Sequence, residues 1–411
     1  MGAGGGLTVK VQVIAPGSVH TGVLPSARAP APAEPSTYDG WRPRAVLGAA
    51  APGGLALPPA QPTAAWMYGP RAVWTDGRMV VAADTGNHRV LVWHRVPDRD
   101  GMPADVVLGQ PDEHSEGPAA GGRGPEAGLY LPTGVLVDRG RLVVADAWHH
   151  RVLVWDAVPT RTATPPDAVI GQPDLGSVEP NRGQERPEAA TFYWPFGIAV
   201  VDGRFLVADT GNRRVLGWRD GVPLDGRPAD LVLGQPDPHQ REENRGGPVG
   251  PASFRWPHAL AGTGTGGLLV ADAGNHRVLR WDAHPDRDRP ADAVLGQPDL
   301  EAGTEFPYVS QAGRLRFPYG LSTVRGGMAL ADTANNRVVL YDAATATGAD
   351  RPCAVLGQRS YDANGENRWE QVTADSLCWP YGVHWHRPEA GPELIAVADS
   401  GNNRVVLWER P

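Results

Sequence analysis

The sequence predicts an all-β protein in which six four-stranded antiparallel blades form a ring, that is, a six-bladed β-propeller. Three observations lead to this prediction. A six-residue phrase from Asp to Arg returns six times, each copy lies among four short β-rich runs, and the last unit lacks a run that is present near the N-terminus. Repetition of one unit at a fixed period is typical of solenoids and propellers. The 52 glycines and 41 prolines among 411 residues favour strands and turns over helices.

The repeated phrase has the composition of a tight turn between two strands. Its copies occupy residues 84–89, 146–151, 209–214, 272–277, 332–337 and 399–404, so that successive copies lie 60 to 67 residues apart. A short apolar run precedes each copy, such as 142–145 (LVVA), and another follows it, such as 152–155 (VLVW). Each copy therefore predicts a strand, a turn and a second strand.

Two further β-rich runs complete each unit. One begins upstream at a proline, as in 195–200 (PFGIAV), and the other ends downstream in Gly-Gln-Pro-Asp, as in 229–237 (ADLVLGQPD). Four short antiparallel strands repeated around an axis are typical of propeller blades, which leave only short, protected sheet edges.

The two ends of the chain predict how the ring closes. The sixth unit stops after its third run, 404–408 (RVVLW), and so lacks a fourth strand. Residues 44–48 (RAVLG) match the fourth runs 292–296 (DAVLG) and 353–357 (CAVLG), but they precede the first repeat. We therefore expect the N-terminal strand to complete the last blade.

The repeated turn resembles that of the NHL repeat family. Six Asp-x-x-Asn-x-Arg-type turns in register, the trailing Gly-Gln-Pro-Asp and the Asn-Arg-Gly loops are together similar to bacterial NHL propellers, and the resemblance covers residues 41–411. The second copy departs from the pattern, because Trp148 and His149 replace Gly and Asn. The first unit departs at 67–71 (MYGPR), where the usual unit has an aromatic residue directly before the proline.

The first 40 residues are expected to lie outside the propeller. They contain a possible strand at 7–14 and a Pro/Ala-rich stretch at 24–35, which is typical of a semi-extended linker. A disordered tail and a docked arm are both compatible with this composition. The expected division is an N-terminal arm and linker at 1–40 and a propeller at 41–411.

Composition and charge argue against several classes of partner. The net charge is −8, and the basic residues are scattered among acidic ones, so nucleic acid is not an expected partner. No segment approaches 18 apolar residues, and the N-terminus lacks a basic stretch followed by an apolar one, so we expect a cytoplasmic protein that does not bind membranes. The two cysteines, Cys353 and Cys378, are expected to be reduced and mostly buried.

The repeated residues are expected to be structural. All six copies keep both the Asp and the Arg, whereas an active site on the axis would need each group once. The aromatic residues that end the third strand of each unit are expected to form the core between blades: Trp93, Trp155, Trp218, Trp281, Tyr341 and Trp408.

The candidate site is instead the mouth of the central channel. The innermost strand of each blade begins on the face that carries the Asp-to-Arg turns and the loops of about 18 residues after Gly-Gln-Pro-Asp, and long loops are often functional. Residues beside the proline that begins this strand should ring the mouth. The expected mouth residues, followed by two on its rim, are Tyr68, Arg71, Thr133, Phe196, His258, Tyr319 and Tyr381, and Trp148 and His149. The aromatics just before the proline are expected to pack between blades: Trp194, Trp256, Phe317 and Trp379.

An aromatic, mostly uncharged ring favours binding over catalysis, because aromatic side chains supply rigid contact area. The expected function is a non-catalytic binding platform for a protein or peptide, with a small molecule also possible, and with no cofactor.

The resemblance also brings enzymes into consideration, since related six-bladed propellers include metal-dependent lactonases and a lyase. The mouth positions contain no Asp, Glu or Asn, so we expect no metal there. A lyase or hydrolase that uses Arg71, His258, Tyr319 and Tyr381 remains the alternative. His384 and His386 share one face of a strand and are expected to be surface residues near its far hairpin.

Overall fold

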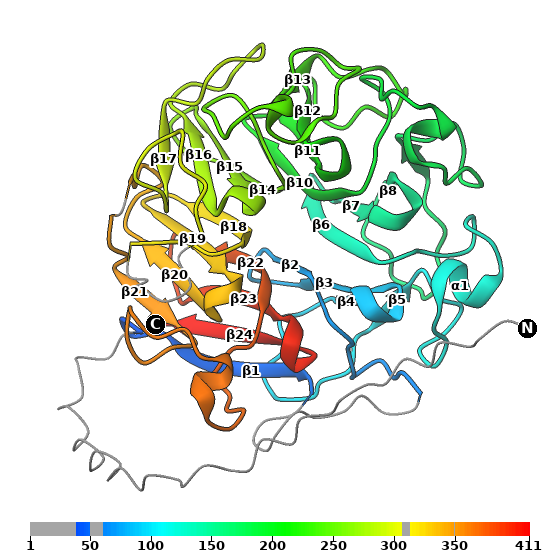
Figure 1. Cartoon of the computed structure of the whole chain (residues 1–411). Coiled ribbons are helices and arrows are strands. Elements are labelled where there is room, and N and C mark those ends of the chain that lie inside the picture. The colour runs from blue at the N-terminus through cyan, green and yellow to red at the C-terminus, as the bar shows by residue number, and fades with distance from the viewer. Residues whose placement is uncertain (1–37, 50–60, 306–312, 349) are drawn as a thin grey trace, which may run out of the picture. The chain divides into compact units, whose positions relative to one another are not determined.

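The computed structural model describes residues 38–49, 61–305, 313–348 and 350–411. Six four-stranded antiparallel sheets are arranged in a ring, which confirms the predicted six-bladed propeller (Figure 1). The expected strand at 7–14 and the Pro/Ala-rich stretch at 24–35 lie outside the described residues.

Each blade runs from an innermost strand at the axis to an outermost strand at the edge of the ring. In that order, the first three blades consist of β2 (Ala72–Thr75), β3 (Val80–Asp84), β4 (Arg89–Trp93) and β5 (Val106–Leu108); β6 (Pro132–Asp138), β7 (Arg141–Asp146), β8 (Arg151–Trp155) and β9 (Ala168–Ile170); and β10 (Pro195–Val201), β11 (Arg204–Asp209), β12 (Arg214–Trp218) and β13 (Leu231–Leu233). The last three consist of β14 (Pro257–Gly262), β15 (Leu268–Asp272), β16 (Arg277–Trp281) and β17 (Ala293–Leu295); β18 (Pro318–Val324), β19 (Gly327–Asp332), β20 (Arg337–Tyr341) and β21 (Ala354–Leu356); and β22 (Pro380–His386), β23 (Glu393–Asp399), β24 (Arg404–Arg410) and β1 (Arg42–Gly48).

Short helical turns make up the remaining regular structure of the described residues. They are α1 (Pro118–Gly122), η1 (Thr85–Asn87), η2 (Ala147–His149), η3 (Pro180–Gly183), η4 (Thr210–Asn212), η5 (Glu243–Gly246), η6 (Ala273–Asn275), η7 (Thr333–Asn335), η8 (Glu366–Trp369) and η9 (Ser400–Asn402).

The N-terminal strand closes the ring as the sequence predicts. β1 is the outermost strand of the sixth blade and pairs antiparallel with β24, with Val46 opposite Val406 and Gly48 opposite Arg404. Val46 and Leu47 are buried, and Arg44 Nη1 lies 2.6 Å from the Glu409 carboxylate. The two ends of the described propeller are therefore held together in one sheet.

Apolar side chains between neighbouring blades form the core. The middle strands are buried on both faces, so they are continuous apolar runs rather than alternating ones. The predicted aromatic residues at the ends of the third strands are all buried there. The indole N–H of Trp93 donates to the Met102 carbonyl oxygen at 3.0 Å, which satisfies its polar atom inside the core.

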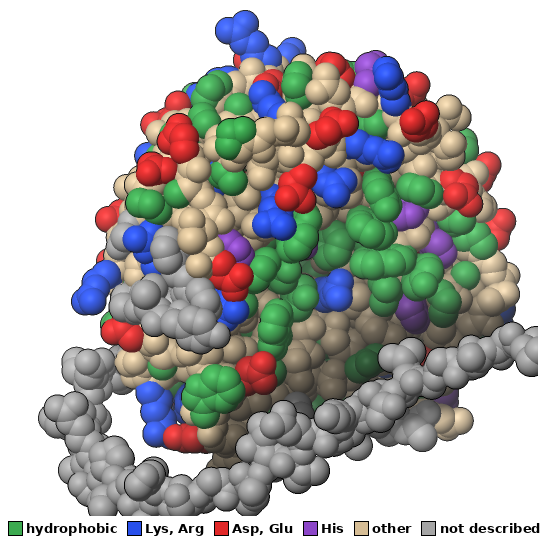
Figure 2. Space-filling model, viewed as in Figure 1, with side chains coloured by type: hydrophobic (Ala, Val, Ile, Leu, Met, Phe, Trp, Pro, Cys, Tyr) green, Lys and Arg blue, Asp and Glu red, His purple; other side chains and the backbone are tan. Residues whose placement is uncertain are grey.

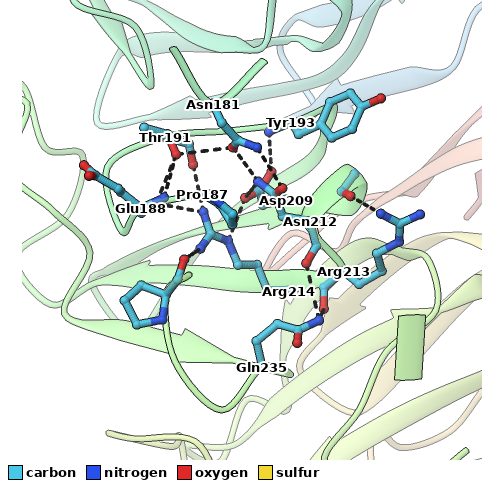
Figure 3. Close-up of polar contacts among 12 residues, drawn as sticks. Asn181, Pro187, Glu188, Thr191, Tyr193, Asp209, Asn212, Arg213, Arg214 and Gln235 are labelled. Atoms are coloured by element: carbon cyan, nitrogen blue, oxygen red, sulfur yellow. Dashed lines mark hydrogen bonds and ion pairs between the residues drawn. The ribbon is translucent and has the colours of Figure 1, made fainter. Parts of the chain in front are cut away.

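A buried Asp–Arg pair organises each repeated turn, as the third blade illustrates (Figure 3). Oδ2 of Asp209 accepts hydrogen bonds from Arg214 Nε and Asn212 Nδ2, both at 2.8 Å, and its Oδ1 accepts from the backbone N–H of Tyr193 at 2.7 Å. The remaining guanidinium nitrogens of Arg214 donate to the carbonyl oxygens of Pro238, Glu188 and Thr191 in the loops between blades. Turns and long loops therefore share one face of the propeller, as expected.

All six Asp–Arg pairs are structural. Both side chains of each pair are 0 to 1% exposed, and the Nε to Oδ2 distances are 2.7 to 2.9 Å. A buried charge is stable only when it is paired and hydrogen-bonded, and here every pair also binds loop carbonyls. The pairs thus couple the inner and outer parts of each blade.

Candidate functional site at the channel mouth

A channel runs along the propeller axis, with a cavity of about 240 Å³. The innermost strands β2, β6, β10, β14, β18 and β22 line it, and its lining contains no Asp or Glu side chain among the described residues. Figure 2 shows hydrophobic side chains gathered in the middle of the ring, with most charged side chains farther out.

The residues that follow the first proline of each inner strand form a ring of side chains, here called the mouth ring. Its members are Arg71, Thr133, Phe196, His258, Tyr319 and Tyr381, and all six line the channel. Successive aromatic members contact one another: the ring centroids of Phe196 and His258 are 4.5 Å apart, those of His258 and Tyr319 4.4 Å, and those of Tyr319 and Tyr381 4.6 Å. The structure therefore brings six of the predicted mouth residues together.

Arg71 completes the mouth ring. Its guanidinium carbon lies 5.0 Å from the Tyr381 ring centroid and 5.9 Å from that of Phe196, distances at which a cation is attracted to an aromatic face. Thr133, the smallest member, turns its hydroxyl to the carbonyl oxygens of Pro195 and Phe196, each at 3.2 Å. The mouth ring is thus aromatic on one side and cationic on the other.

His258 is a neutral hydrogen-bonding group in this ring. Its Nδ1 lies 3.0 Å from the Trp256 carbonyl oxygen, which can only accept, so Nδ1 carries the proton and Nε2 is an acceptor. Burial, with a smaller contribution from the Arg71 charge, lowers the pKa of His258 to about 4. Burial also raises the pKa of Tyr319, so its hydroxyl stays protonated and able to donate.

Tyr68 in the first blade does not occupy the mouth position that the sequence predicts for it. In each blade the turn Asp accepts a hydrogen bond from one backbone N–H of the loop, and Tyr68 occupies that position in the first blade. Gly69 therefore takes the place of the aromatic before the proline, with a positive φ of 52°. Tyr68 does not line the channel; it lies over Gly86 and is 51% exposed.

The two expected rim residues separate in the structure. Trp148 is at the mouth, with its ring 5.4 Å from Trp194 and 6.1 Å from Phe196. His149 is 5% exposed, and its Nδ1 lies 2.8 Å from Asp146 Oδ2. The imidazole thus replaces the turn Asn of the other blades inside the Asp–Arg network, and the expectation of His149 as an accessible rim residue is wrong.

The aromatics before the proline lie nearer the surface than expected. Trp194, Trp256 and Phe317 are half-buried, and Trp379 is 39% exposed. The first three do contact rings of a neighbouring blade, as expected, but they are not fully buried between the blades. Trp256 and Phe317 stack with centroids 6.1 Å apart, which extends the apolar surface beyond the mouth ring.

A contact between blades that the sequence analysis missed holds the residue before the proline in five blades, including three of these aromatics. In five of the six copies, the residue just before the Arg of the repeated phrase accepts a hydrogen bond from the backbone N–H of the residue before the next blade's proline. The pairs are His88 with Leu131, His150 with Trp194, His276 with Phe317, Asn336 with Trp379 and Asn403 with Gly69, at 2.9 to 3.3 Å. All five donors have positive φ. This turn position is His or Asn in five of the six copies, and that restriction in the sequence could have indicated the contact.

The sixth junction supports this explanation. Arg213 occupies the turn position before the fourth blade, and a guanidinium has no acceptor atom. Its counterpart Trp256 is absent from the residues with positive φ. A hydrogen-bond acceptor at this turn position is therefore found together with a left-handed backbone at the residue before the next blade's proline.

His384 lines the channel, so the expectation that it is a surface residue near the hairpin is wrong. Its Nδ1 accepts from the Thr75 backbone N–H at 3.4 Å, its ring centroid is 5.7 Å from Trp74, and burial lowers its pKa to about 4. Both cysteines are free, and Cys378 is buried as expected, but Cys353 is exposed.

The described residues contain no group of three or more His, Cys, Asp or Glu side chains that could hold a metal ion. Within the same part of the chain, no helix is long and apolar enough to cross a membrane.

Comparison with known proteins relates this geometry to one repeat family. The family model of the NHL repeat matches residues 129–155, which lie in the second blade. NHL repeat-containing protein 2 from Homo sapiens is 30% identical over 165 residues, which cover 38% of this chain and 20% of that protein. The matched segment thus spans one fifth of the length of this relative.

Solved structures with similar chains include the computationally designed Ika8 protein (11% identity, TM-score 0.38, 89% of this chain and 99% of that chain). A streptogramin B lyase structure matches with 12% identity and a TM-score of 0.42, covering 87% of this chain and 96% of the lyase. A structural genomics protein from Bacteroides thetaiotaomicron has 11% identity and a TM-score of 0.43, covering 90% of this chain and 75% of its own. The chain is therefore a six-bladed β-propeller whose second blade matches the NHL-repeat model and which shares a segment of 30% identity with an NHL repeat-containing protein.

Proposed function

We propose that the chain is a binding platform that takes a protein, peptide or other ligand at the mouth of its channel. The observation that carries this proposal is the continuous aromatic surface formed by Phe196, His258, Tyr319 and Tyr381 around a hollow whose described lining has no carboxylate. Partly exposed aromatic side chains that are held rigidly are typical anchors of binding surfaces.

This aromatic surface is here called the aromatic arc, and the residues at its two ends provide the test. The double substitution Phe196→Ala and Tyr381→Ala removes two anchors, and we expect it to cost about 2 kcal/mol of binding free energy, or roughly 30-fold in affinity. The matched control is Leu224→Ala, because Leu224 is 43% exposed and lies in the loop between β12 and β13, away from the mouth.

The measurement is capture from a cell extract by the immobilised protein, with retained proteins, peptides and small molecules identified by mass spectrometry. We expect the unsubstituted protein and Leu224→Ala to retain the same molecules and the double variant to lose them, while all three proteins melt at similar temperatures. Retention that is unchanged in the double variant, or the absence of any molecule retained by the unsubstituted protein, contradicts the proposal.

The alternative function, a lyase or hydrolase at the same mouth, has one observation in its favour. Arg71, Tyr381, Tyr319 and His258 lie in a continuous chain of contacts, and the Nε2 of a neutral His258 is an acceptor of the kind that a general base requires. The substitution His258→Gln separates the two functions: a binding platform keeps its ligand unaltered with either residue, whereas an enzyme converts the ligand and loses turnover in the variant.

A further inference from the structure

Among the described residues, Arg71 is the single charged side chain that lines the channel. This part of the chain contributes no carboxylate to the lining, and both of its imidazoles there, His258 and His384, are neutral at pH 7 because burial lowers their pKa values to about 4. The protein as a whole has a net charge of −8, so the channel mouth differs in sign from the rest of the molecule. In the described lining of the channel, Arg71 is therefore the one fixed positive charge that an anionic ligand could contact.

Neighbouring arginines on the same face differ from Arg71 in having carboxylate partners. Arg255 Nε lies 2.9 Å from Glu243, and Arg316 Nε lies 2.5 Å from Glu305. For the Arg71 side chain, the structure shows only the aromatic contacts with Tyr381 and Phe196 and no hydrogen bond or ion pair within the described residues. A guanidinium has five donors arranged to match a carboxylate, and in Arg71 these donors remain available.

Further polar atoms of the mouth ring also lack partners in the described part of the chain. These are the hydroxyl groups of Tyr319 and Tyr381, which can donate to an anion, and the Nε2 atom of His258, which can accept. Their rings are held in place by stacking, so the polar atoms are fixed relative to Arg71. The mouth therefore combines one cation, two donors and one acceptor with apolar surfaces.

We propose that the mouth ring binds a free carboxylate carried on an apolar group, with Arg71 as the anion-binding residue and the aromatic arc in contact with the apolar group. This inference rests on the proposed binding function and specifies its ligand. The C-terminal residue of a peptide and a small aromatic acid share this chemistry. A peptide also offers an amide N–H to Nε2 of His258.

The experiment is titration calorimetry with four probes at low ionic strength. Benzoate represents a small acid, and benzamide is its uncharged counterpart. An N-acetylated tetrapeptide that ends in a free Phe carboxylate represents a chain terminus, and its C-terminally amidated form is the counterpart. We expect at least one carboxylate to bind, its uncharged counterpart to bind at least tenfold more weakly, and the affinity to fall as salt is added. The better-bound carboxylate identifies the source of the ligand.

The variants assign the binding to Arg71. Arg71→Gln should lower carboxylate affinity at least tenfold and Arg71→Lys should restore part of it. Arg255→Gln should leave affinity unchanged; Arg255 is a matched control because it lies over an aromatic ring, 5.1 Å from Trp256, but is ion-paired. Melting temperatures show whether each variant is folded.

Two outcomes would overturn the inference. One is that neither carboxylate binds better than its uncharged counterpart, and the other is that Arg71→Gln binds as tightly as Arg255→Gln. In either case the capture experiment with Phe196→Ala and Tyr381→Ala still decides the binding function, so the failure of the carboxylate assignment and the failure of the platform are distinguishable.

Discussion

Removal of the N-terminal strand should open the ring, and the structure sets the size of the effect. A truncation of residues 1–47 removes Val46 and Leu47, which are 2% and 0% exposed. Full burial of a Val or Leu side chain contributes about 1.5–3 kcal/mol, so the two together contribute about 3–6 kcal/mol. Protein domains are stable by about 5–15 kcal/mol, so this loss is a large part of the total. It also exposes the edge of β24 to pairing with other molecules.

Two comparisons make the ring-closure prediction specific. A truncation of residues 1–35 keeps β1 and should melt like the full chain, whereas the longer truncation should unfold at lower temperature and aggregate. Within the full chain, Leu47→Ala should cost about 2–5 kcal/mol as a buried truncation. Arg42→Ala should cost at most about 1 kcal/mol, because the Arg42 side chain is 67% exposed and its ion pair with Glu409 lies at the surface.

The assays are urea denaturation followed by fluorescence and light scattering during heating. Equal stability of the two truncations would refute the closing role of β1, and so would equal effects of Leu47→Ala and Arg42→Ala.

Three further predictions follow from the charges and the turns. Burial lowers the pKa values of His150 and His276 to about 4, so the unfolded chain binds more protons than the folded one and stability should fall as the pH drops from about 6.5 towards 4. The double variant His150→Asn and His276→Asn keeps a hydrogen-bond acceptor at both positions but does not titrate, so its melting temperature should depend less steeply on pH. An unchanged pH dependence in the variant contradicts this prediction. Arg214→Met leaves Asp209 buried without its partner and should cost about 3–5 kcal/mol in chemical denaturation, whereas a loss below about 1 kcal/mol would show that the pair is not structural. Nucleic-acid binding should be weak and salt-sensitive at most because of the −8 charge, and submicromolar RNA affinity at physiological salt would overturn that expectation.

The blade count, the closing strand and the Asp–Arg pairs could be predicted because they are properties of repetition. A group that recurs in register six times must have the same local surroundings in each blade, so one local explanation suffices. The mouth ring could also be predicted from the repeat, since the residue after each proline lies at the same place in its blade, next to the axis. Arg71, Phe196, His258, Tyr319 and Tyr381 are found together for this reason.

The errors occurred where one copy departs from the repeat or where side-chain exposure depends on backbone conformation. Tyr68 precedes a glycine rather than an aromatic, and only the hydrogen bond to Asp84 reveals its register. His149 binds Asp146 in the place of an Asn, a substitution that composition alone does not identify. Trp379 is 39% exposed, has a left-handed backbone with φ of 49°, and donates its N–H to Asn336 of the preceding blade, and none of these features is visible in its position before a proline.

The proposed binding site can be located directly by crystallising the protein with a brominated form of the better-bound carboxylate, either 4-bromobenzoate or the tetrapeptide ending in 4-bromophenylalanine, and finding the bromine by anomalous scattering. The proposal predicts a bromine position at the channel mouth, beside the aromatic arc of Phe196, Tyr319 and Tyr381, with the carboxylate at Arg71. It also predicts that this position is empty in crystals of Arg71→Gln grown with the same compound. A bromine found only elsewhere on the protein, or one that keeps its place at the mouth in Arg71→Gln, would contradict the assignment of Arg71 as the carboxylate-binding residue.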